Sequence, residues 1–497
     1  MRTELDPADP GRRKFIGDFS LASLSLLSLT LITGGCESWL DAIRHRPLRR
    51  LIRNTSEANQ QIDIYRNAVA MMKALPASDC RNWTNQANIH NNFCPHGNWY
   101  FFPWHRAYLF HFEKICQKLT GESHFGLPYW NWALDGHLPA QFWTPPAANA
   151  LFDATRLCTA SSVADAGSVG LPLIDGFCNE PDFSLFAGGA ASALRMRTSS
   201  GNIEATPHNY VHGSFVRGDM AAFTSPLDAI FWNHHCMVDL CWFEWNITRQ
   251  HANTNDPAWT YFNFSGMFCD GDGAPAPDMS PIVTLLMPLL SYQYETGIAG
   301  TVPAPLKSLR DKRAFQRMQD IVKKGADVKL RIRQRYALPH GVEVTVQRPS
   351  AETIPVDAKE FAAILGGDAK ERVLLIIRQL VQPPSSDTFL RVFIEKPDAD
   401  ATTSRDDPHY AGSFYFFVHG AAHPAGHAPG PDAGDLIVDI TPTLRKLMNA
   451  DAVRDLKGIS VSLVAVPVDA EKALPVTLVA AGLEFAISPV DVRLLEF

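Results

Sequence analysis

Two groups of histidines constrain most strongly what this chain can fold into. His90, His96 and His105 lie in or beside the stretch "CPHGNWYFFPWHRAYLFHFEK" (94–114), where His96 is expected in a loop and His105 at the start of a helix. A second group follows much later, within 208–235. One buried histidine is usually a satisfied core residue, but two groups beside aromatic-rich helices favour a metal centre.

The spacing inside the second group is that of residues on one helical face. In "HNYVH" (208–212), His208 and His212 are four residues apart, so on a helix both rings project from the same side and can bind one metal ion. In "NHHCMVD" (233–239), His235 and Asp239 have the same separation. This spacing predicts that Asp239 orients an imidazole from behind by hydrogen bonding.

The choice of metal is narrowed by what accompanies the histidines. Neutral imidazole suits copper, zinc, iron and nickel. No pair of ligating carboxylates lies nearby, which argues against a di-iron site, and no Cys-x-x-Cys pair indicates structural zinc. The nine cysteines are scattered and form no legible disulfide framework. Cys158 and Cys178, which flank a loop-like stretch, are the candidate bridge in an oxidising compartment.

Composition excludes one broad class of function. The net charge is -7, the isoelectric point is near 6.2, and no basic stripe is present, which argues against nucleic-acid binding. A length of 497 residues accommodates two or three domains. Tryptophan and phenylalanine are concentrated between residues 83 and 264, as a buried, aromatic-lined site would need.

The first 36 residues resemble a targeting signal. The pair Arg12 and Arg13 precedes an apolar run from Phe19 to Ile32, and "TGGC" ends at Cys36. The run is shorter than the roughly 20 residues that span a bilayer as a helix. A twin-arginine signal implies export of a folded, bacterial-type protein to the periplasm or cell envelope, with any membrane anchorage only through this segment. The alternative is a retained N-terminal tail on a cytoplasmic protein.

Hydrophobic periodicity predicts helices in the first two thirds of the chain. A helix is expected over 56–75, with Ile62, Tyr65, Val69 and Met72 on one face, and another from His105 to Gly121. Further helical stretches are expected at 208–212, 225–245 and 309–322. Residues 140–200, rich in Ala, Gly, Pro and Ser, are expected to form long irregular loops.

Short β-type runs begin near residue 343 and continue to the end of the chain. They include "RVLLIIRQL", "FLRVFIE", "GSFYFFVHG" and "ISVSLVAVPV", separated by turn-rich segments. The predicted fold is therefore a mainly α domain over 50–340, with a four-helix-bundle core holding the metal site, and an all-β sandwich over 341–497.

Two long motifs resemble those of the tyrosinase, catechol oxidase and haemocyanin family of binuclear (type 3) copper proteins. "HGNWYFFPWHRAYLFHFE" (96–113) is similar to the first copper motif of that family, and "DAIFWNHHCMVD" (228–239) to the second. The resemblance covers roughly residues 50–340. It departs from the usual pattern at Ala229, where family members usually have Pro.

This resemblance implies the ligands of two copper ions. His90, His96 and His105 would bind one, and His208, His212 and His235, rather than His234, the other. Cys94, in Cys-x-His order with His96, is similar to the cysteine that forms a thioether with histidine in fungal tyrosinases. The alternative for Cys94 is a small buried residue.

The resemblance also implies the reaction. With dioxygen as co-substrate, phenols would be hydroxylated at the ortho carbon and o-diphenols oxidised to o-quinones. Glu204 and Asn209 resemble the pair that holds a water accepting the phenol proton, and Phe223 falls near the position that gates substrate entry. The alternative roles for Glu204 and Asn209 are a surface acid and a solvent-facing helix residue.

The β domain resembles the C-terminal domain that covers the copper site in plant polyphenol oxidases and haemocyanins and can hold the enzyme latent. Two alternative functions remain: a catechol or o-aminophenol oxidase without monophenolase activity, and a haemocyanin-like oxygen carrier. The expected partners are small phenols, with a homo-oligomer as a further expectation. His419, His423 and His427 form either a flexible Gly/Pro loop or a copper-handling or pH-sensing segment.

Overall fold

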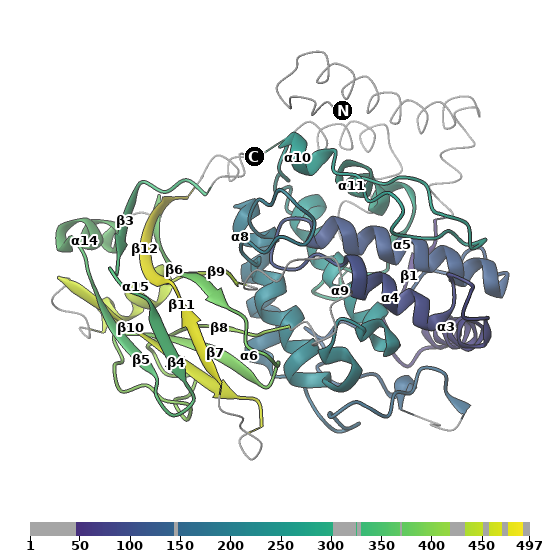
Figure 1. Cartoon of the computed structure of the whole chain (residues 1–497), viewed down its shortest axis with the longest axis horizontal. Coiled ribbons are helices and arrows are strands. Elements are labelled where there is room, and N and C mark those ends of the chain that lie inside the picture. Colours follow the sequence, from purple (N-terminus) through teal and green to yellow (C-terminus); the bar gives the residue numbers. More distant parts are fainter. Residues whose placement is uncertain are drawn as a thin grey trace, which may run out of the picture.

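The computed structural model describes residues 46–143, 148–301, 325, 330–367, 370–417, 433–450, 457–469 and 476–490. A mainly helical part, formed by the described residues between 46 and 301, lies beside a β part formed by the described residues from 330 onwards (Figure 1). The prediction of a helical domain followed by a β-sandwich is confirmed. The predicted signal segment, the helix over 309–322, and His419, His423 and His427 lie outside the described residues.

Helices α3 (Ser56–Ala74) and α5 (Phe101–Thr120) follow the hydrophobic pattern that predicted them. The Thr55 side chain caps α3, and the predicted face of that helix is buried. Helix α5 ends at Gly121, whose φ of 77° is the left-handed conformation that glycine adopts without strain. It begins at Phe101, earlier than predicted, because Pro103 falls in the first turn, where its missing N–H breaks no helical hydrogen bond.

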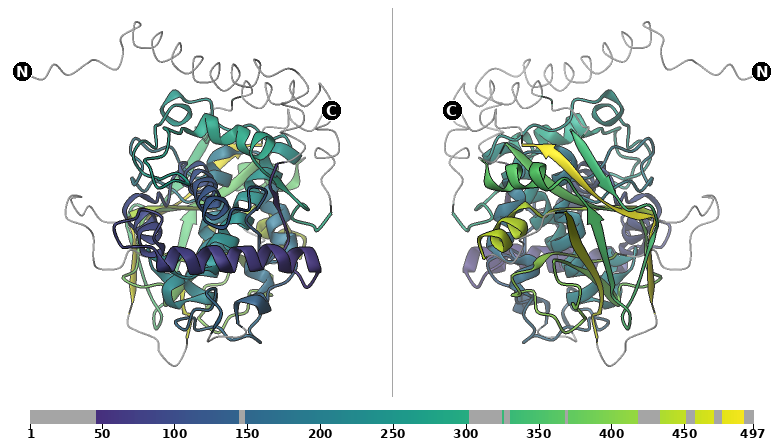
Figure 2. Two further views of the ribbon diagram at one scale, coloured as in Figure 1. Left: turned by 90° about the vertical axis from the view of Figure 1, so that its right-hand side faces the viewer. Right: turned by 90° about the vertical axis from the view of Figure 1, so that its left-hand side faces the viewer.

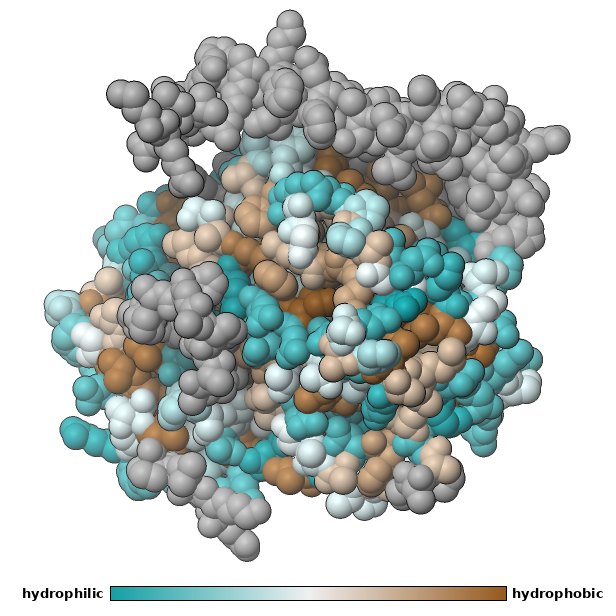
Figure 3. All heavy atoms as spheres, turned by 45° about the vertical axis from the view of Figure 1, so that its right-hand side comes forward, coloured by the Kyte–Doolittle hydropathy of each residue, from teal (hydrophilic) through white to brown (hydrophobic). Residues whose placement is uncertain are grey.

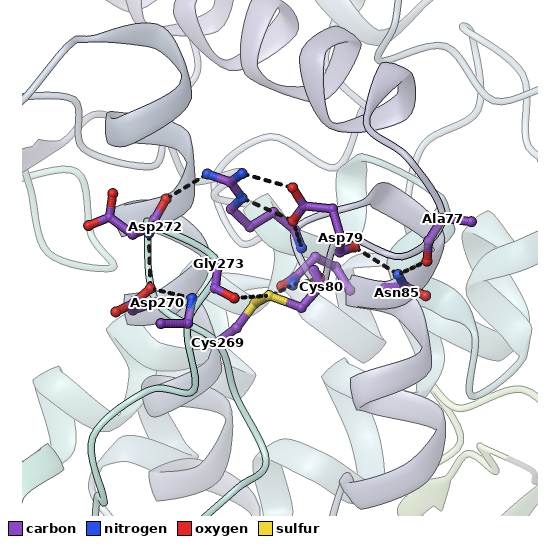
Figure 4. The surroundings of a disulfide bond; sticks show 12 residues. Ala77, Asp79, Cys80, Asn85, Cys269, Asp270, Asp272 and Gly273 are labelled. Carbon is purple, nitrogen blue, oxygen red and sulfur yellow. Dashed lines mark hydrogen bonds and ion pairs between the residues drawn. A yellow bond between two sulfur atoms is a disulfide. The ribbon is translucent and has the colours of Figure 1, made fainter.

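Helix α4 (Trp83–Phe93) was not predicted from the sequence, although it carries His90. Its Asn-rich sequence has weak helix propensity, so tertiary contacts must hold it. A disulfide between Cys80 and Cys269 fixes the chain just before the helix (Figure 4). The prediction of a Cys158–Cys178 bridge is wrong, because both of these cysteines are buried free thiols.

Helix α9 (Ile230–Phe243) is buried on every side. It packs against α5, where the rings of Phe112 and Trp232 stack with centroids 3.4 Å apart. A helix that is apolar all round shows no amphipathic stripe, which is why its limits were less clear from the pattern than those of α3.

The remaining elements of the helical part are short. The described residues between 140 and 200 include short helices among their loops, so the expectation of irregular loops alone was incomplete. These are η1 (Ala140–Phe142), α6 (Ala166–Val169), α7 (Leu171–Cys178) and α8 (Phe183–Ala187). Others precede or follow α9: η3 (Glu204–His208), η4 (Val211–Val216), η5 (Gly218–Ala221), η6 (Ser225–Leu227), η7 (Glu244–Thr248), α10 (Pro257–Thr260) and α11 (Pro281–Leu290). Strands β1 (Leu48–Arg49) and β2 (Gln293–Tyr294) pair in parallel and join the two ends of this part.

The β part consists of antiparallel sheets around a second core (Figure 2). One four-stranded sheet has the order β5-β10-β7-β8, from β5 (Ser350–Pro355), β10 (Gly458–Pro467), β7 (Thr388–Ile394) and β8 (Tyr410–Phe414). The other has the order β3-β12-β6-β9, from β3 (Gln334–Ala337), β12 (Gly482–Pro489), β6 (Glu371–Val381) and β9 (Ala433–Asp439). Strands β4 (Val342–Thr345) and β11 (Thr477–Ala480) pair separately, and helices α14 (Ala358–Gly366) and α15 (Thr441–Asn449) complete the part.

Strand β8 ends at Phe414, so the run "GSFYFF" does not continue as a strand. Beyond it, the chain leaves the sheet and enters the helical part. Tyr415 N–H donates to the carbonyl of Ala205 at 2.9 Å, and the Thr206 hydroxyl donates to the Ser413 carbonyl at 3.0 Å. A buried ion pair between Glu180 and Arg372, at 2.6 Å, also joins the two parts. The β part is thus attached directly over the segment that contains His208.

Two observations bear on whether the described residues cross a membrane. On the face in Figure 3, hydrophobic residues lie in small groups separated by hydrophilic ones. Within the described ranges, no helix has both the length and the apolar character needed to cross a bilayer.

Candidate metal centre

The first cluster lies where α4 meets α5. His90 is on α4, His96 is in the turn that follows, and His105 is in the second turn of α5. Their ligand nitrogens and the Cys94 sulfur all lie within 4.8 Å of one another, and all four residues are buried. The structure thus brings together the three histidines that the sequence assigned to one metal.

The second cluster is formed by the η3–η4 segment and α9. It contains His208, His212, His234 and His235, whose ligand nitrogens again lie within 4.8 Å of one another. Residues 204–216 are wound largely as π-helix, with Pro207 inside. Such bulges recur at functional sites because they change which side chains face inward. The predicted helix at 208–212 is present in this altered form.

The two clusters face each other across a short distance. The rings of His105 and His235 are stacked, with centroids 4.3 Å apart and planes 9° apart. The rings of His96 and His208 have centroids 5.5 Å apart. Two metal ions bound by these clusters would therefore be close neighbours, as a binuclear site requires.

Hydrogen bonds fix which nitrogen of four of these rings is available to a metal. The Nδ1 atoms of four histidines each lie 2.7–2.8 Å from an oxygen that can only accept: His90 with Phe223 O, His105 with Phe101 O, His212 with Met220 O, and His208 with Asn209 Oδ1. Nδ1 therefore carries the proton in each neutral ring, and the Nε2 lone pair is left for a ligand.

Buried Nε2 atoms without hydrogen-bond partners indicate that a metal fits in these clusters. His90 Nε2 and His208 Nε2 are buried and have no hydrogen-bond partner among the described residues. A buried nitrogen lone pair without a partner is costly unless something binds it. A metal ion in each cluster would satisfy one of these atoms.

Burial also keeps these rings in the form that binds metal. Desolvation lowers the pKa of every histidine in the two clusters, to about 3 for His105 and about 4 for His212. The neighbouring imidazoles add to this effect at His96 and His235. Near neutral pH the rings are therefore uncharged, and neutral imidazole is the ligating form.

Cys94 lies inside the first cluster. Its sulfur is 3.4 Å from His96 Nδ1 and 3.2 Å from His105 Nε2. Burial raises the pKa of its thiol well above the usual range, so it is not a reactive thiolate in the unmodified protein. The sulfur nevertheless lies beside the His96 ring.

Asp239 does not orient His235, so that prediction is wrong. Its carboxylate accepts from Arg106 at 2.5 Å and from Arg49 at 3.2 Å, and also from two tyrosines, Tyr292 and Tyr294. His235 Nδ1 has no hydrogen-bond partner among the described residues. Burial alone would raise the pKa of Asp239, but the two guanidiniums bring it below its usual value. The residue ties α9 to α5 and to the chain termini of the helical part.

Glu204 and Asn209 are both buried beside the second cluster, which excludes the alternatives of a surface acid and a solvent-facing residue. Glu204 Oε1 accepts from the Gly97 N–H at 2.7 Å, so it reaches across to the loop of the first cluster. Asn209 Oδ1 accepts from His208, while its Nδ2 donates to the Tyr415 carbonyl at 2.9 Å. Asn209 therefore links a candidate ligand to the β part.

Phe223 lies over the first cluster, with ring centroids 5.0 Å from His96 and 5.7 Å from His90. Phe417, a residue that the sequence did not single out, stacks on Phe223 at 4.8 Å. The Phe417 ring is also 4.9 Å from His96 and 4.6 Å from His212. It fills the space next to both clusters from the side of the β part. Only its place as the last residue of an aromatic run could have indicated it.

Comparison with known proteins agrees with this site. The model of the common central domain of tyrosinase matches residues 78–165 and 172–248, which contain all the clustered histidines. The tyrosinase HcTyr1 of Hahella sp. (strain CCB-MM4) is 26% identical over 78% of this chain and 89% of its own length. The chloroplastic polyphenol oxidase A1 of Vicia faba is 32% identical over 38% of each chain.

Solved structures agree in fold. A latent aurone synthase (polyphenol oxidase) from a natural source superposes with a TM-score of 0.63 over 90% of each chain, at 22% identity. Latent apple tyrosinase superposes with a TM-score of 0.60 over 89% of this chain and 97% of its own, also at 22% identity. Both superpositions cover the helical part and the β part together.

Proposed function

This chain belongs to the tyrosinase family of copper-dependent phenol oxidoreductases, and from that premise we propose that it hydroxylates monophenols and oxidises o-diphenols to o-quinones. The observation that carries the proposal is the pair of buried imidazole clusters facing each other beside Glu204 and Asn209. Small phenols such as L-tyrosine and L-DOPA are the proposed substrates.

The buried histidines fit two copper ions. We propose His90, His96 and His105 as the ligands of one, and His208, His212 and His235 as those of the other. Nitrogen ligands, neutral rings and the absence of carboxylates from both clusters suit copper. The copper pair supplies the activation of dioxygen, the proposed co-substrate, and the protein supplies position, burial and access.

Hydroxylation needs the phenol without its proton, although a free phenol has a pKa near 10. We assign the acceptor role to the Glu204 carboxylate, acting directly or through a water held by the Asn209 amide. A positioned base of this kind typically contributes about 10² to 10⁴ in rate. The extension of Glu204 towards the first cluster, where its Oε1 bonds to Gly97, supports its closeness to both metal positions.

The substrate ring would occupy the space that Phe417 now fills. There it would stack on Phe223 and face His212, the two contacts that Phe417 makes. The neighbouring Tyr415 carbonyl meanwhile holds the Asn209 amide. We therefore propose that the full-length chain is latent, and that displacement of the segment 413–417 opens the site and frees Asn209.

The protein is proposed to act after export, in the periplasm or cell envelope. The relatives include both bacterial and chloroplastic proteins, and the latter carry their compartment in their names. The two arginines and the apolar run in the first 36 residues support an export signal of the twin-arginine type. Export of a folded protein would allow copper loading beforehand.

The test is turnover by copper-loaded, full-length protein before and after limited proteolysis near residue 340. Oxygen uptake and quinone absorbance are followed with L-tyrosine and with L-DOPA. We expect little turnover before cleavage and turnover of both substrates after it. Turnover of L-DOPA alone would make the protein a diphenol oxidase and overturn the assignment of Glu204 and Asn209. Oxygen binding without turnover of either substrate after cleavage would favour an oxygen carrier.

A further inference from the structure

The second cluster holds one more imidazole than a three-histidine copper site needs. His234 is fully buried, and its ring centroid lies 4.9 Å from that of His212 and 5.4 Å from that of His208. Its ligand nitrogen lies within the same 4.8 Å as those of the other three histidines. Distance alone therefore does not explain why His234 would stay out of the metal's coordination sphere.

The hydrogen bonding of His234 is opposite in direction to that of His208 and His212, whose Nδ1 atoms donate to oxygens. The indole Nε1–H of Trp132 donates to His234 Nδ1 at 3.1 Å. Because an indole nitrogen can only donate, Nδ1 must accept, and the proton of the neutral ring lies on Nε2. The four candidate ligands whose Nδ1 faces an acceptor oxygen have the reverse arrangement, with the proton on Nδ1 and a lone pair on Nε2. In this tautomer His234 has no lone pair free for a metal, and its Nε2–H has no acceptor among the described residues.

Two hydrogen bonds attach the segment that carries Trp132 to α9. The Trp130 N–H donates to the Asn233 carbonyl at 3.2 Å, and the Asn233 side chain donates to the Pro128 carbonyl at 2.7 Å. The segment 128–132 is therefore attached to α9 one residue before His234. The indole is placed by this attachment and is itself 1% exposed. A side chain so held acts as a fixed donor, because little freedom is left for it to turn away.

We propose that Trp132 keeps His234 from binding copper, so that the second copper has three imidazole ligands and retains an open position for the substrate. The inference rests on the proposed copper loading of this site. Trp132 is a positioning residue in this scheme, since it acts on the metal only through His234. Without the indole N–H, His234 Nδ1 becomes free, the ring can change tautomer, and a fourth imidazole competes for the metal.

The test is the Trp132→Phe variant of the full-length, copper-loaded protein, with Trp130→Phe as the matched control. Trp130 is on the same segment and also loses an indole hydrogen bond, to the Asp135 carbonyl, but none to His234. X-ray absorption gives the imidazole count per copper, and a competing chelator gives the rate of copper release. We expect Trp132→Phe to raise the imidazole count and slow release from one site about tenfold, and Trp130→Phe to change neither.

A double variant separates this role from simple packing. Adding His234→Phe to Trp132→Phe should restore the parent coordination and release rate, because the competing ring is gone. Parent-like release in Trp132→Phe alone would overturn the proposal. If that variant does not fold, the number of imidazole ligands per copper is measured in His234→Gln instead. A number lower than in the parent protein would make His234 a ligand and overturn the proposal. An unchanged number would support it. None of these readouts depends on phenol turnover. A failure of this inference can therefore be told apart from a failure of the proposed reaction.

Discussion

The ring of Phe417 lies 4.6 Å from the ring of His212, centroid to centroid, although the two residues come from opposite parts of the molecule. Phe417 follows the end of a β strand, whereas His212 is in the π-helical segment beneath it. The contact places an apolar side chain where a phenol would have to enter. On the proposed reaction, the β part would limit access at Phe417, a residue that can be changed separately from the rest of that part.

Replacing Phe417 by Ala in the full-length chain should activate it towards L-DOPA. We expect kcat/KM to rise about tenfold or more, a change of about 1.4 kcal/mol in the barrier, because the ring no longer occupies the substrate space. Initial rates of quinone formation measure this. The control is Phe416→Ala, since Phe416 packs in the β core. Equal activation by both variants would instead mean that loosening of the β part is the cause.

Glu204→Gln should separate the two reactions. In the proteolysed enzyme we expect L-tyrosine turnover to fall about 10²-fold, because the amide cannot accept the phenol proton. L-DOPA turnover should change little. Gln retains an oxygen that can accept from the Gly97 N–H, so the loop contact is kept. An equal fall with both substrates would show that Glu204 acts through that loop and not as a base.

His111 should make the protein less stable in acid. Burial lowers its pKa from 6.5 to about 4, so between these values the folded state binds fewer protons than the unfolded state. The contribution of His111 to the free energy of unfolding is greatest above pH 6.5. It falls as the pH drops towards 4, by about 1.4 kcal/mol per pH unit at most. Urea unfolding from pH 7 to 4.5 measures the slope.

The variant that tests this pH effect is His111→Phe. His111 stacks on Phe268, so a phenyl ring suits the site and should flatten the acid dependence. An identical slope in His111→Phe and the parent would contradict the prediction.

Cys94 should form a thioether with the His96 ring once copper is loaded in air. The reaction removes the thiol hydrogen and one ring hydrogen, and the two electrons pass to dioxygen. The peptide containing both residues should then weigh two hydrogens less than its sequence predicts, and Cys94→Ser should abolish the difference. Complete alkylation of Cys94 after unfolding of the loaded protein would refute the bond.

The Cys80–Cys269 disulfide should stabilise the folded helical part. It joins positions 189 residues apart, so it restricts the unfolded chain strongly. Replacing both cysteines by Ser should reduce the free energy of unfolding by about 2–4 kcal/mol, measured by urea titration. Cys158→Ser, which removes a free thiol, is the control. A loss no greater than that of the control would mean that the bridge contributes nothing.

The shared face of His208 and His212 and the ends of α3 and α5 reflect short-range patterns, whereas the full set of ligands was implied by the family resemblance. Residues four apart share a helical face whatever surrounds them, and Thr55 and Gly121 each act within one turn. Helix α4 has a capping Asn82 but weak helix propensity. It depends on a disulfide nearby and on Tyr108, whose hydroxyl donates to the Gln86 carbonyl.

Tertiary structure decided the rest of the site. The spacing of Asp239 from His235 was right for a contact, but two arginines from other elements bind the carboxylate more strongly than a neutral ring would. Phe417 looked like part of a strand until packing placed it against the histidines.

Helical periodicity in the amino-acid sequence places His208 and His212 on one face, because residues four apart are neighbours on any helix. The hydrogen bond that each ring makes, and hence the position of its proton, depends instead on contacts between distant segments. His234 and His235 are adjacent in the chain and equally buried, yet Trp132, far away in sequence, bonds to only one of them. Such contacts depend on how distant segments pack, which no local pattern of residues encodes.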